Sequence, residues 1–149
     1  MEKILFVCTG NTCRSPMAEY VFKDMCRRQR LPFDAKSAGI CTRTGIPMSL
    51  NSLAVLSEYN IDGSDFTSTS IDEIDISEFS HFAVMTDEHK EVLENTFEVD
   101  AEKITVLNVD DPYGSGISRY EMCLDEVIEA VKVFIDILGE KYADKGADK

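Results

Sequence analysis

The fold depends on one short segment, Cys8-Thr9-Gly10-Asn11-Thr12-Cys13-Arg14-Ser15. A nearly continuous apolar run over residues 3–7 precedes it, and a helix-like pattern begins directly after it at residues 16–19. Such a run is typical of a central parallel strand that is covered on both faces. The segment therefore lies where a buried strand meets the N-terminus of a helix.

Ser15 and Pro16 predict how this helix begins. A serine hydroxyl is a favourable N-cap, and proline is tolerated at the first helical position because its missing N–H would have no partner there. Apolar side chains then recur at helical spacing as far as Met25, and the helix is expected to end before Leu31-Pro32.

The rest of the chain alternates strand and helix patterns. We predict strands over residues 33–38, 79–85 and 103–107, helices over residues 48–59 and 87–97, a last helix that includes residues 123–138, a loop with a short helix over residues 64–77, and a frayed tail over residues 143–149. The order β-α-β-α-β-α-β-α predicts one α/β domain over residues 1–149, an open four-stranded parallel sheet with helices on both faces.

The composition argues against several kinds of partner. The net charge of −13 over 149 residues disfavours binding to nucleic acid or to anionic membranes. No apolar run reaches the roughly 20 residues that span a bilayer, and the N-terminus has no signal-peptide pattern. We expect a cytoplasmic protein that acts as a monomer.

Five cysteines and two histidines offer no complete metal site. The number of cysteines is odd, so we interpret them as reduced thiols rather than as a disulfide framework. A zinc site needs a second pair of ligands beside Cys8 and Cys13, and His81 and His89 do not supply one. We assign both histidines a solvated or structural place. Neither a Gly-Lys-Ser/Thr loop nor a Gly-x-Gly-x-x-Gly loop is present, so no nucleotide and no other cofactor is expected.

The topology brings a distant acidic pair to the first loop. In open parallel sheets, ligands bind beyond the carboxyl ends of the strands. The loops after the first and fourth predicted strands both lie at that edge. We therefore expect Cys8 to lie near the adjacent acids Asp110 and Asp111.

The segment has the chemistry of a phosphate cradle that carries its own nucleophile. Backbone N–H groups around Gly10 can form an anion nest, and the helix N-terminus adds positive potential. The Arg14 guanidinium can donate two hydrogen bonds to one phosphoryl group. The same field should lower the pKa of Cys8, and Ser15 can donate to its thiolate. The alternative is a buried Cys8 without reactivity, a surface Arg14 and a serine that only caps the helix.

The chain resembles the low-molecular-weight protein tyrosine phosphatases. The resemblance rests on motifs spread along nearly the whole sequence: residues 7–19, Ser37-Ala38-Gly39, Gly45-Ile46-Pro47, Met85 and Asp111-Pro112-Tyr113. It implies the same four-stranded fold and hydrolysis of protein tyrosine phosphate, with phosphorylated proteins or peptides as substrates and inorganic phosphate as product. It implies neither a metal nor a cofactor.

The resemblance also implies roles for individual residues. Cys8 would be the nucleophile, Arg14 would bind the phosphoryl oxygens, and Asp111 would act as general acid and then base. Asn11 and Ser15 would hold the loop and the thiolate, and Cys13 would be able to form a reversible disulfide with Cys8. The phosphate-binding set would be Thr9, Gly10, Asn11, Thr12, Cys13, Arg14 and Ser15, with Tyr113 as an aromatic lip for the substrate.

Three alternatives stay open at this point. Thr12 stands where many tyrosine-specific members carry a larger aliphatic residue, and this feature, with Met85-Thr86 and His89-Lys90, resembles protein arginine phosphatases. Arsenate reductase shares the loop, but residues 79–100 contain no cysteine for a disulfide relay. A phosphopeptide-binding module without activity would be expected to lack Cys8 or Asp111.

Overall fold

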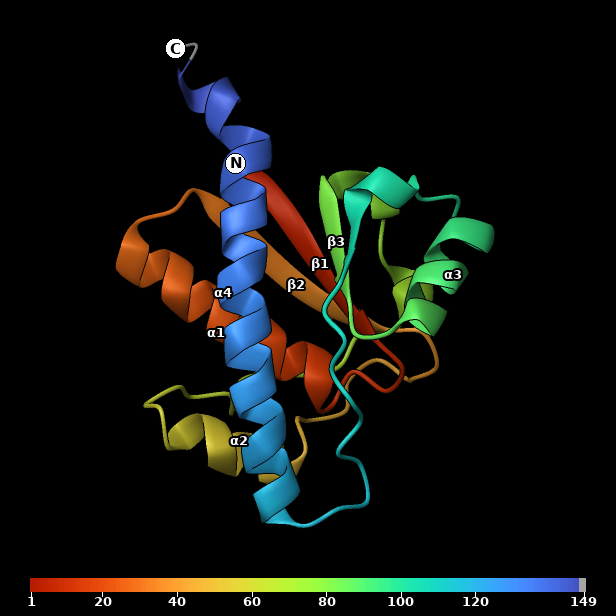
Figure 1. Ribbon diagram of the computed structural model, residues 1–149. Helices are drawn as coiled ribbons and strands as arrows, with labels where there is room; N and C mark the ends of the chain where they lie inside the picture. Colours follow the sequence, from red (N-terminus) through yellow and green to blue (C-terminus); the bar gives the residue numbers. More distant parts are fainter. Residues whose placement is uncertain (148–149) are drawn as a thin grey trace.

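The computed structural model describes the backbone of residues 1–147 and the side chains of residues 1–142. It is a single-domain α/β fold with four parallel strands in the order β2-β1-β3-β4 (Figure 1). The strands are β1 (Glu2–Cys8), β2 (Phe33–Gly39), β3 (His81–Val84) and β4 (Ile104–Val106). The predicted fold class and the parallel sheet are confirmed.

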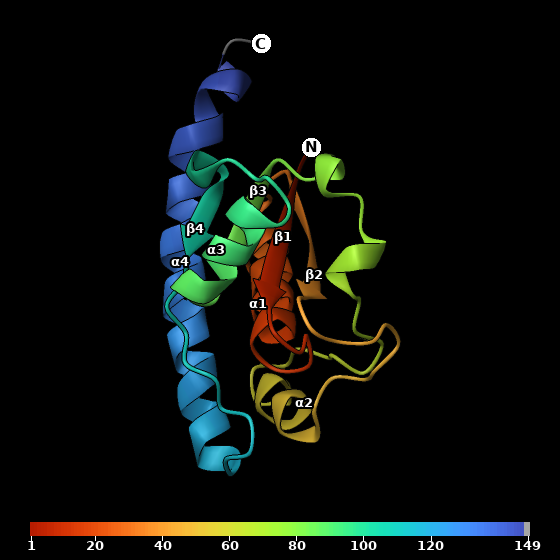
Figure 2. The same ribbon diagram turned by 90° about the vertical axis from the view of Figure 1, so that its right-hand side faces the viewer.

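Four α-helices connect and follow the strands, with three short 3-10 helices between them. The α-helices are α1 (Arg14–Gln29), α2 (Leu50–Ser57), α3 (Asp87–Asn95) and α4 (Ile117–Ala147), and the 3-10 helices are Ile71–Glu73, Ile76–Glu78 and Ala101–Lys103. Figure 2 shows α2 at the lower end of the molecule, beyond the carboxyl ends of the strands. Within the described residues, no helix has both the length and the hydropathy to cross a membrane.

Strand β1 forms the centre of the core, because both of its faces are buried. Ile4 and Phe6 face one cluster with Phe22 of α1 and Phe134 of α4, whereas Leu5 faces a second cluster on the α3 side. The Phe6 ring lies 5.3 Å from Phe22 and 5.8 Å from Phe134 between centroids, in edge-to-face contact. The helices therefore cover both faces of the sheet, as predicted.

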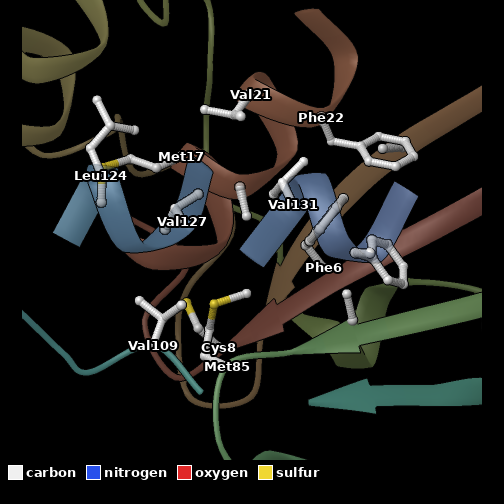
Figure 3. Packing of buried hydrophobic residues seen from close by; sticks show 14 of the residues in the cluster. Phe6, Cys8, Met17, Val21, Phe22, Met85, Val109, Leu124, Val127 and Val131 are labelled. Atoms are coloured by element: carbon white, nitrogen blue, oxygen red, sulfur yellow. The ribbon is translucent and has the colours of Figure 1, made fainter. Parts of the chain in front are cut away.

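The buried cluster extends to the carboxyl edge of the sheet. Figure 3 shows Cys8 at the end of this cluster, beside Met85 and Val109. The Met85 N–H donates to Val7, and the Val109 N–H donates to Met85. These bonds join the end of β1 to the segments that follow β3 and β4 at one edge of the sheet, which is where the sequence predicted the ligand site.

Several predicted boundaries are wrong by a few residues. Helix α2 begins at Leu50 rather than Met48, because the Ser49 hydroxyl accepts the Ser52 N–H and caps the helix. Strands β3 and β4 and helix α3 are each shorter than predicted. The tail predicted to be frayed continues α4 as far as Ala147, and residues 148–149 lie outside the described residues.

The predicted start of α1 is wrong in a way that bears on the site. The helix begins at Arg14 with Cys13 at the N-cap, and no side chain caps it. Ser15 is therefore not the cap, and Pro16 lies inside the first turn. The Ser15 hydroxyl is instead engaged by Cys8 and Asn11.

Candidate active site

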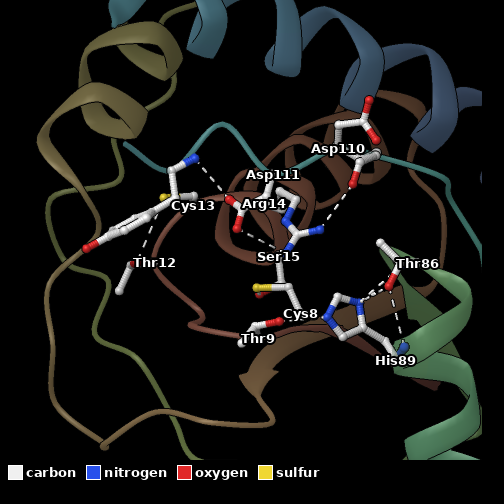
Figure 4. A network of polar contacts seen from close by, with 12 residues as sticks. Cys8, Thr9, Thr12, Cys13, Arg14, Ser15, Thr86, His89, Asp110 and Asp111 are labelled. Carbon is white, nitrogen blue, oxygen red and sulfur yellow. Dashed lines mark hydrogen bonds and ion pairs between the residues drawn. The ribbon is translucent and has the colours of Figure 1, made fainter. Parts of the chain in front are cut away.

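The Cys8 thiol lies in a pocket of about 220 Å³ at the carboxyl edge of β1. The pocket is lined by residues 8–14, Asp111 and Tyr113. Figure 4 shows the side chains of this site gathered around Arg14. The structure thus brings the Cys8 thiol, the Arg14 guanidinium and the Asp111 carboxylate together, as predicted. Asp111 comes from a segment about 100 residues later in the sequence than the other two.

Two groups of the loop contact the sulfur of Cys8. The Ser15 Oγ lies 2.8 Å from Cys8 Sγ, and the Asn11 backbone N–H donates to the sulfur at 3.3 Å. Both are groups that stabilise a thiolate when they donate. The sulfur therefore sits among donors although its side chain is almost completely buried.

The expected low pKa of Cys8 is wrong for this arrangement. Burial raises the pKa of the thiol above its ordinary value, whereas the Ser15 hydroxyl and N–H, the Arg14 charge and the Asn11 N–H lower it by less. The desolvation of a sulfur that packs against the core outweighs the positive field of the loop.

Arg14 is buried and held from two sides. Its Nη1 donates to the Val109 carbonyl at 3.2 Å, and its Nη2 lies 3.6 Å from Asp111 Oδ2. A guanidinium has five N–H donors in a planar fork. The guanidinium thus keeps N–H donors for an anion in the pocket. The N-terminus of helix α1, which favours anions, points toward the same pocket.

Asn11 fixes the shape of the loop. Its backbone φ is 54°, in the left-handed region. Its amide nitrogen donates to Ser15 Oγ at 2.8 Å and to Ser37 Oγ at 2.9 Å, and its amide oxygen accepts the Thr69 N–H at 2.8 Å. Residues 9–13, between β1 and α1, form what we call the phosphate-cradle loop. Asn11 therefore ties this loop to α1, to β2 and to the segment before Ile71.

The two adjacent acids occupy different environments. The Asp111 carboxylate faces the pocket and accepts the Tyr113 N–H at 3.0 Å. The Asp110 side chain is 86% exposed, lies 3.7 Å from Arg119 and does not line the pocket. The Tyr113 side chain is 78% exposed at the pocket wall. The structure therefore favours Asp111 over Asp110 as the acid near a ligand.

The second loop cysteine meets residues that the sequence did not single out. Cys13 Sγ lies 3.3 Å from Tyr120 Oη and 3.6 Å from Ser49 Oγ. The neighbouring Thr12 carbonyl accepts the Ser49 N–H. Cys8 and Cys13 are both free thiols here, so their disulfide stays a prediction.

His89 is the site residue that the sequence reasoning missed. Of the two predicted places, the solvated one is wrong and the structural one holds, because the ring is buried and its Nε2 lies 2.9 Å from Thr9 Oγ1 in the loop. A local signal was available, because His89 stands three residues after Thr86, the N-cap of a helix that follows β3 at the ligand edge.

A buried thiol in a loop of donors at a helix N-terminus, with an arginine and an acid above it, is the architecture of a cysteine-dependent phosphate site. The family model of the low molecular weight phosphotyrosine protein phosphatases matches residues 3–144. The chain belongs to this family. The match leaves out residues 1–2 and 145–149, so the prediction that the domain spans residues 1–149 stays a prediction for these two ends.

Relatives within the family carry two kinds of name. The protein-arginine-phosphatase of Bacillus subtilis is 31% identical over an alignment of 138 positions, and the match covers 87% of this chain and 91% of that protein. The low molecular weight protein tyrosine phosphatase of T. tengcongensis is 34% identical with a TM-score of 0.86, over 91% of this chain and 99% of that one.

A third relative is a mutant of the YwlE arginine phosphatase in which a serine replaces a cysteine and the active-site serine is phosphorylated. It is 28% identical with a TM-score of 0.83, over 91% of this chain and 95% of that one.

Gly39 tests whether the shape of the loop matters. An added Cβ at Gly39 would lie 2.7 Å from the Thr9 carbonyl oxygen and 3.0 Å from Asn11 Cβ, so the loop would have to move. Gly39→Ala should cost about 1–3 kcal/mol of stability and weaken binding of inorganic phosphate. Urea denaturation and titration calorimetry measure the two effects.

Gly139→Ala is the matched control, because a Cβ there meets nothing within 4 Å. This substitution should leave phosphate binding unchanged and should not lower stability, since alanine favours a helix more than glycine does. Equal phosphate affinity in the two variants would show that the contact between Gly39 and the loop is not required.

Proposed function

We propose that this protein hydrolyses protein tyrosine phosphate through a cysteinyl-phosphate intermediate. The observation that carries the proposal is the Cys8 sulfur beneath Arg14 and Asp111 in one pocket, with the Ser15 hydroxyl at 2.8 Å and the Asn11 N–H donor at 3.3 Å. An anion-binding site that contains a nucleophile can both bind a phosphoryl group and accept it. The phosphorylated serine of the YwlE mutant supports the same position for covalent transfer.

In the first step, Cys8 attacks phosphorus while the bond to the leaving oxygen breaks. The thiol gives its proton to solvent water before the attack, and the donors from Ser15 and Asn11 then stabilise the thiolate against the raised pKa. Arg14 and the loop N–H groups bind the three equatorial oxygens, whose charge has to be balanced in a loose transition state. Asp111, in its protonated form, gives its proton to the leaving oxygen.

In the second step, water replaces the leaving group above the phosphorus. The Asp111 carboxylate takes a proton from that water, oxygen bonds to phosphorus, and the sulfur–phosphorus bond breaks. The products are inorganic phosphate and the Cys8 thiolate. One residue thus acts first as acid and then as base, as microscopic reversibility allows.

The pocket wall supports an aromatic substrate. Tyr113 is an exposed ring beside Asp111, where a phenyl group attached to the phosphate would lie. Stacking of aromatic rings contributes about 0.5–1.5 kcal/mol beyond their buried area. We therefore place phosphotyrosine first.

Phosphoarginine is the second candidate, and Thr12 is the observation that favours it. This short hydroxyl residue lines the pocket where a larger aliphatic side chain would narrow it. A relative at 31% identity is also named for arginine phosphatase activity.

Phosphorylated proteins are the partners that the family implies. All five cysteines are free thiols, and we propose a cytoplasmic location, where thiols stay reduced. We also propose that the protein acts as a monomer.

The substrate class is tested by comparing matched peptides that carry phosphotyrosine or phosphoarginine. The reduced protein should give the higher kcat/KM with phosphotyrosine, and Cys8→Ala should turn over neither peptide. A higher kcat/KM with phosphoarginine would replace the first candidate by the second. Lack of turnover with both peptides and with aryl phosphates would contradict a phosphatase.

Asp111 is tested by varying the leaving group. Asp111→Asn should slow hydrolysis of phenyl phosphate by about 10²–10⁴-fold, because phenolate needs a proton as it leaves. Hydrolysis of dinitrophenyl phosphate, whose leaving group needs no proton, should slow much less in the same variant. Asp110→Asn is the matched control and should change neither rate greatly. Equal losses on both substrates in Asp111→Asn would remove Asp111 from the acid role.

A further inference from the structure

His89 links the start of α3 to the phosphate-cradle loop. Its Nδ1 accepts the Thr86 backbone N–H at 3.2 Å and lies 3.1 Å from the Thr86 hydroxyl. Its Nε2 lies 2.9 Å from Thr9 Oγ1. Figure 4 shows the imidazole ring between Thr9 and Thr86. One ring thus spans from the cap of a helix to the residue directly after Cys8.

The contact with Thr86 determines which nitrogen of His89 carries the proton. A backbone N–H is always a donor, so Nδ1 must accept and has no hydrogen. In a neutral imidazole the proton then lies on Nε2. Burial and the nearby Arg14 charge lower the pKa of His89 to about 4, although Asp111 acts the other way. The neutral tautomer with a hydrogen on Nε2 is the form present near pH 7.

This tautomer also orients the hydroxyl of Thr9. Because Nε2–H donates, Thr9 Oγ1 accepts, and the hydroxyl hydrogen has to point away from the ring. Within the described side chains, no other group forms a hydrogen bond with this hydroxyl. Thr9 lines the pocket, and its carbonyl is fixed by the Cys41 N–H at 3.0 Å.

We propose that His89 is a positioning residue that turns the Thr9 hydroxyl into a hydrogen-bond donor for a phosphoryl oxygen. The proposal rests on the proposed function, because it assigns a further donor to the same phosphate site. A hydroxyl that could rotate freely would have to be ordered when the anion binds, whereas the imidazole orders it in advance. His89 itself does not touch the phosphate.

The test measures binding of inorganic phosphate to the reduced protein by titration calorimetry, so it does not depend on turnover. His89→Asn keeps an acceptor near the Thr86 N–H but is too short to reach Thr9. His89→Gln extends a donor to the position of Nε2. Thr9→Val removes the hydroxyl at nearly constant shape, at a residue whose side chain is exposed.

His89→Asn and Thr9→Val should each weaken phosphate binding by about tenfold, the effect of one hydrogen bond to an anion. The double variant should bind no more weakly than Thr9→Val alone, because both changes remove the same donor. His89→Gln should recover most of the affinity.

His81→Asn is the control for replacing a buried histidine. His81 Nε2 lies 2.9 Å from Thr105 Oγ1, and loss of this contact should lower the stability of the protein without changing its phosphate affinity.

Three results would overturn the proposal. Thr9→Val or folded His89→Asn could bind phosphate as the unchanged protein does. The losses of phosphate affinity in the two single variants could multiply in the double variant, which would show that His89 and Thr9 act independently. Finally, the unchanged protein could fail to bind phosphate at all, and this result alone would also contradict the proposed function.

Discussion

The buried amide of Asn11 is the interaction on which the site depends. A left-handed backbone at a residue other than glycine costs of order 1–3 kcal/mol and persists only where its surroundings fix it. Three hydrogen bonds fix it here, at 2.8, 2.9 and 2.8 Å. They hold the loop in a curve that turns the Asn11 N–H toward Cys8 Sγ. The Ser37 hydroxyl in turn donates to the buried Glu19 carboxylate, which pairs with Lys23.

The electrostatics of the protein are local rather than global. The chain carries a net charge of −13, which repels anions at a distance. At the pocket the α1 N-terminus and the buried Arg14, which lies 3.6 Å from Asp111, supply local positive charge. Buried charges are screened much less than exposed ones. The protein should therefore capture a single phosphoryl group at short range and repel polyanions such as nucleic acids.

Local patterns in the sequence were enough to predict the sheet and the composition of the loop. The apolar run of β1, the glycine in the loop and the Asp-Pro-Tyr motif each carry their meaning within a few residues. What could not be predicted depends on partners that are distant in sequence. The hydroxyl of Ser15 caps nothing because Cys8 and Asn11 engage it. Burial beside Met85 and Val109 raises the pKa of Cys8, and His89 contacts a loop 80 residues earlier in the sequence. The first two effects leave no mark in the spacing of residue types, whereas the spacing of Thr86 and His89 indicates the start of α3 but not the contact with the loop.

The most direct test of the account is to detect the phosphoryl group on Cys8. The reduced protein is mixed with an aryl phosphate, denatured within the first turnovers, and analysed by mass spectrometry of the intact chain and of its peptides. We predict a fraction of the protein with the added mass of one phosphoryl group, located at Cys8 and absent from Cys8→Ala. Steady turnover without this species, or with the phosphoryl group on another residue, would contradict the account.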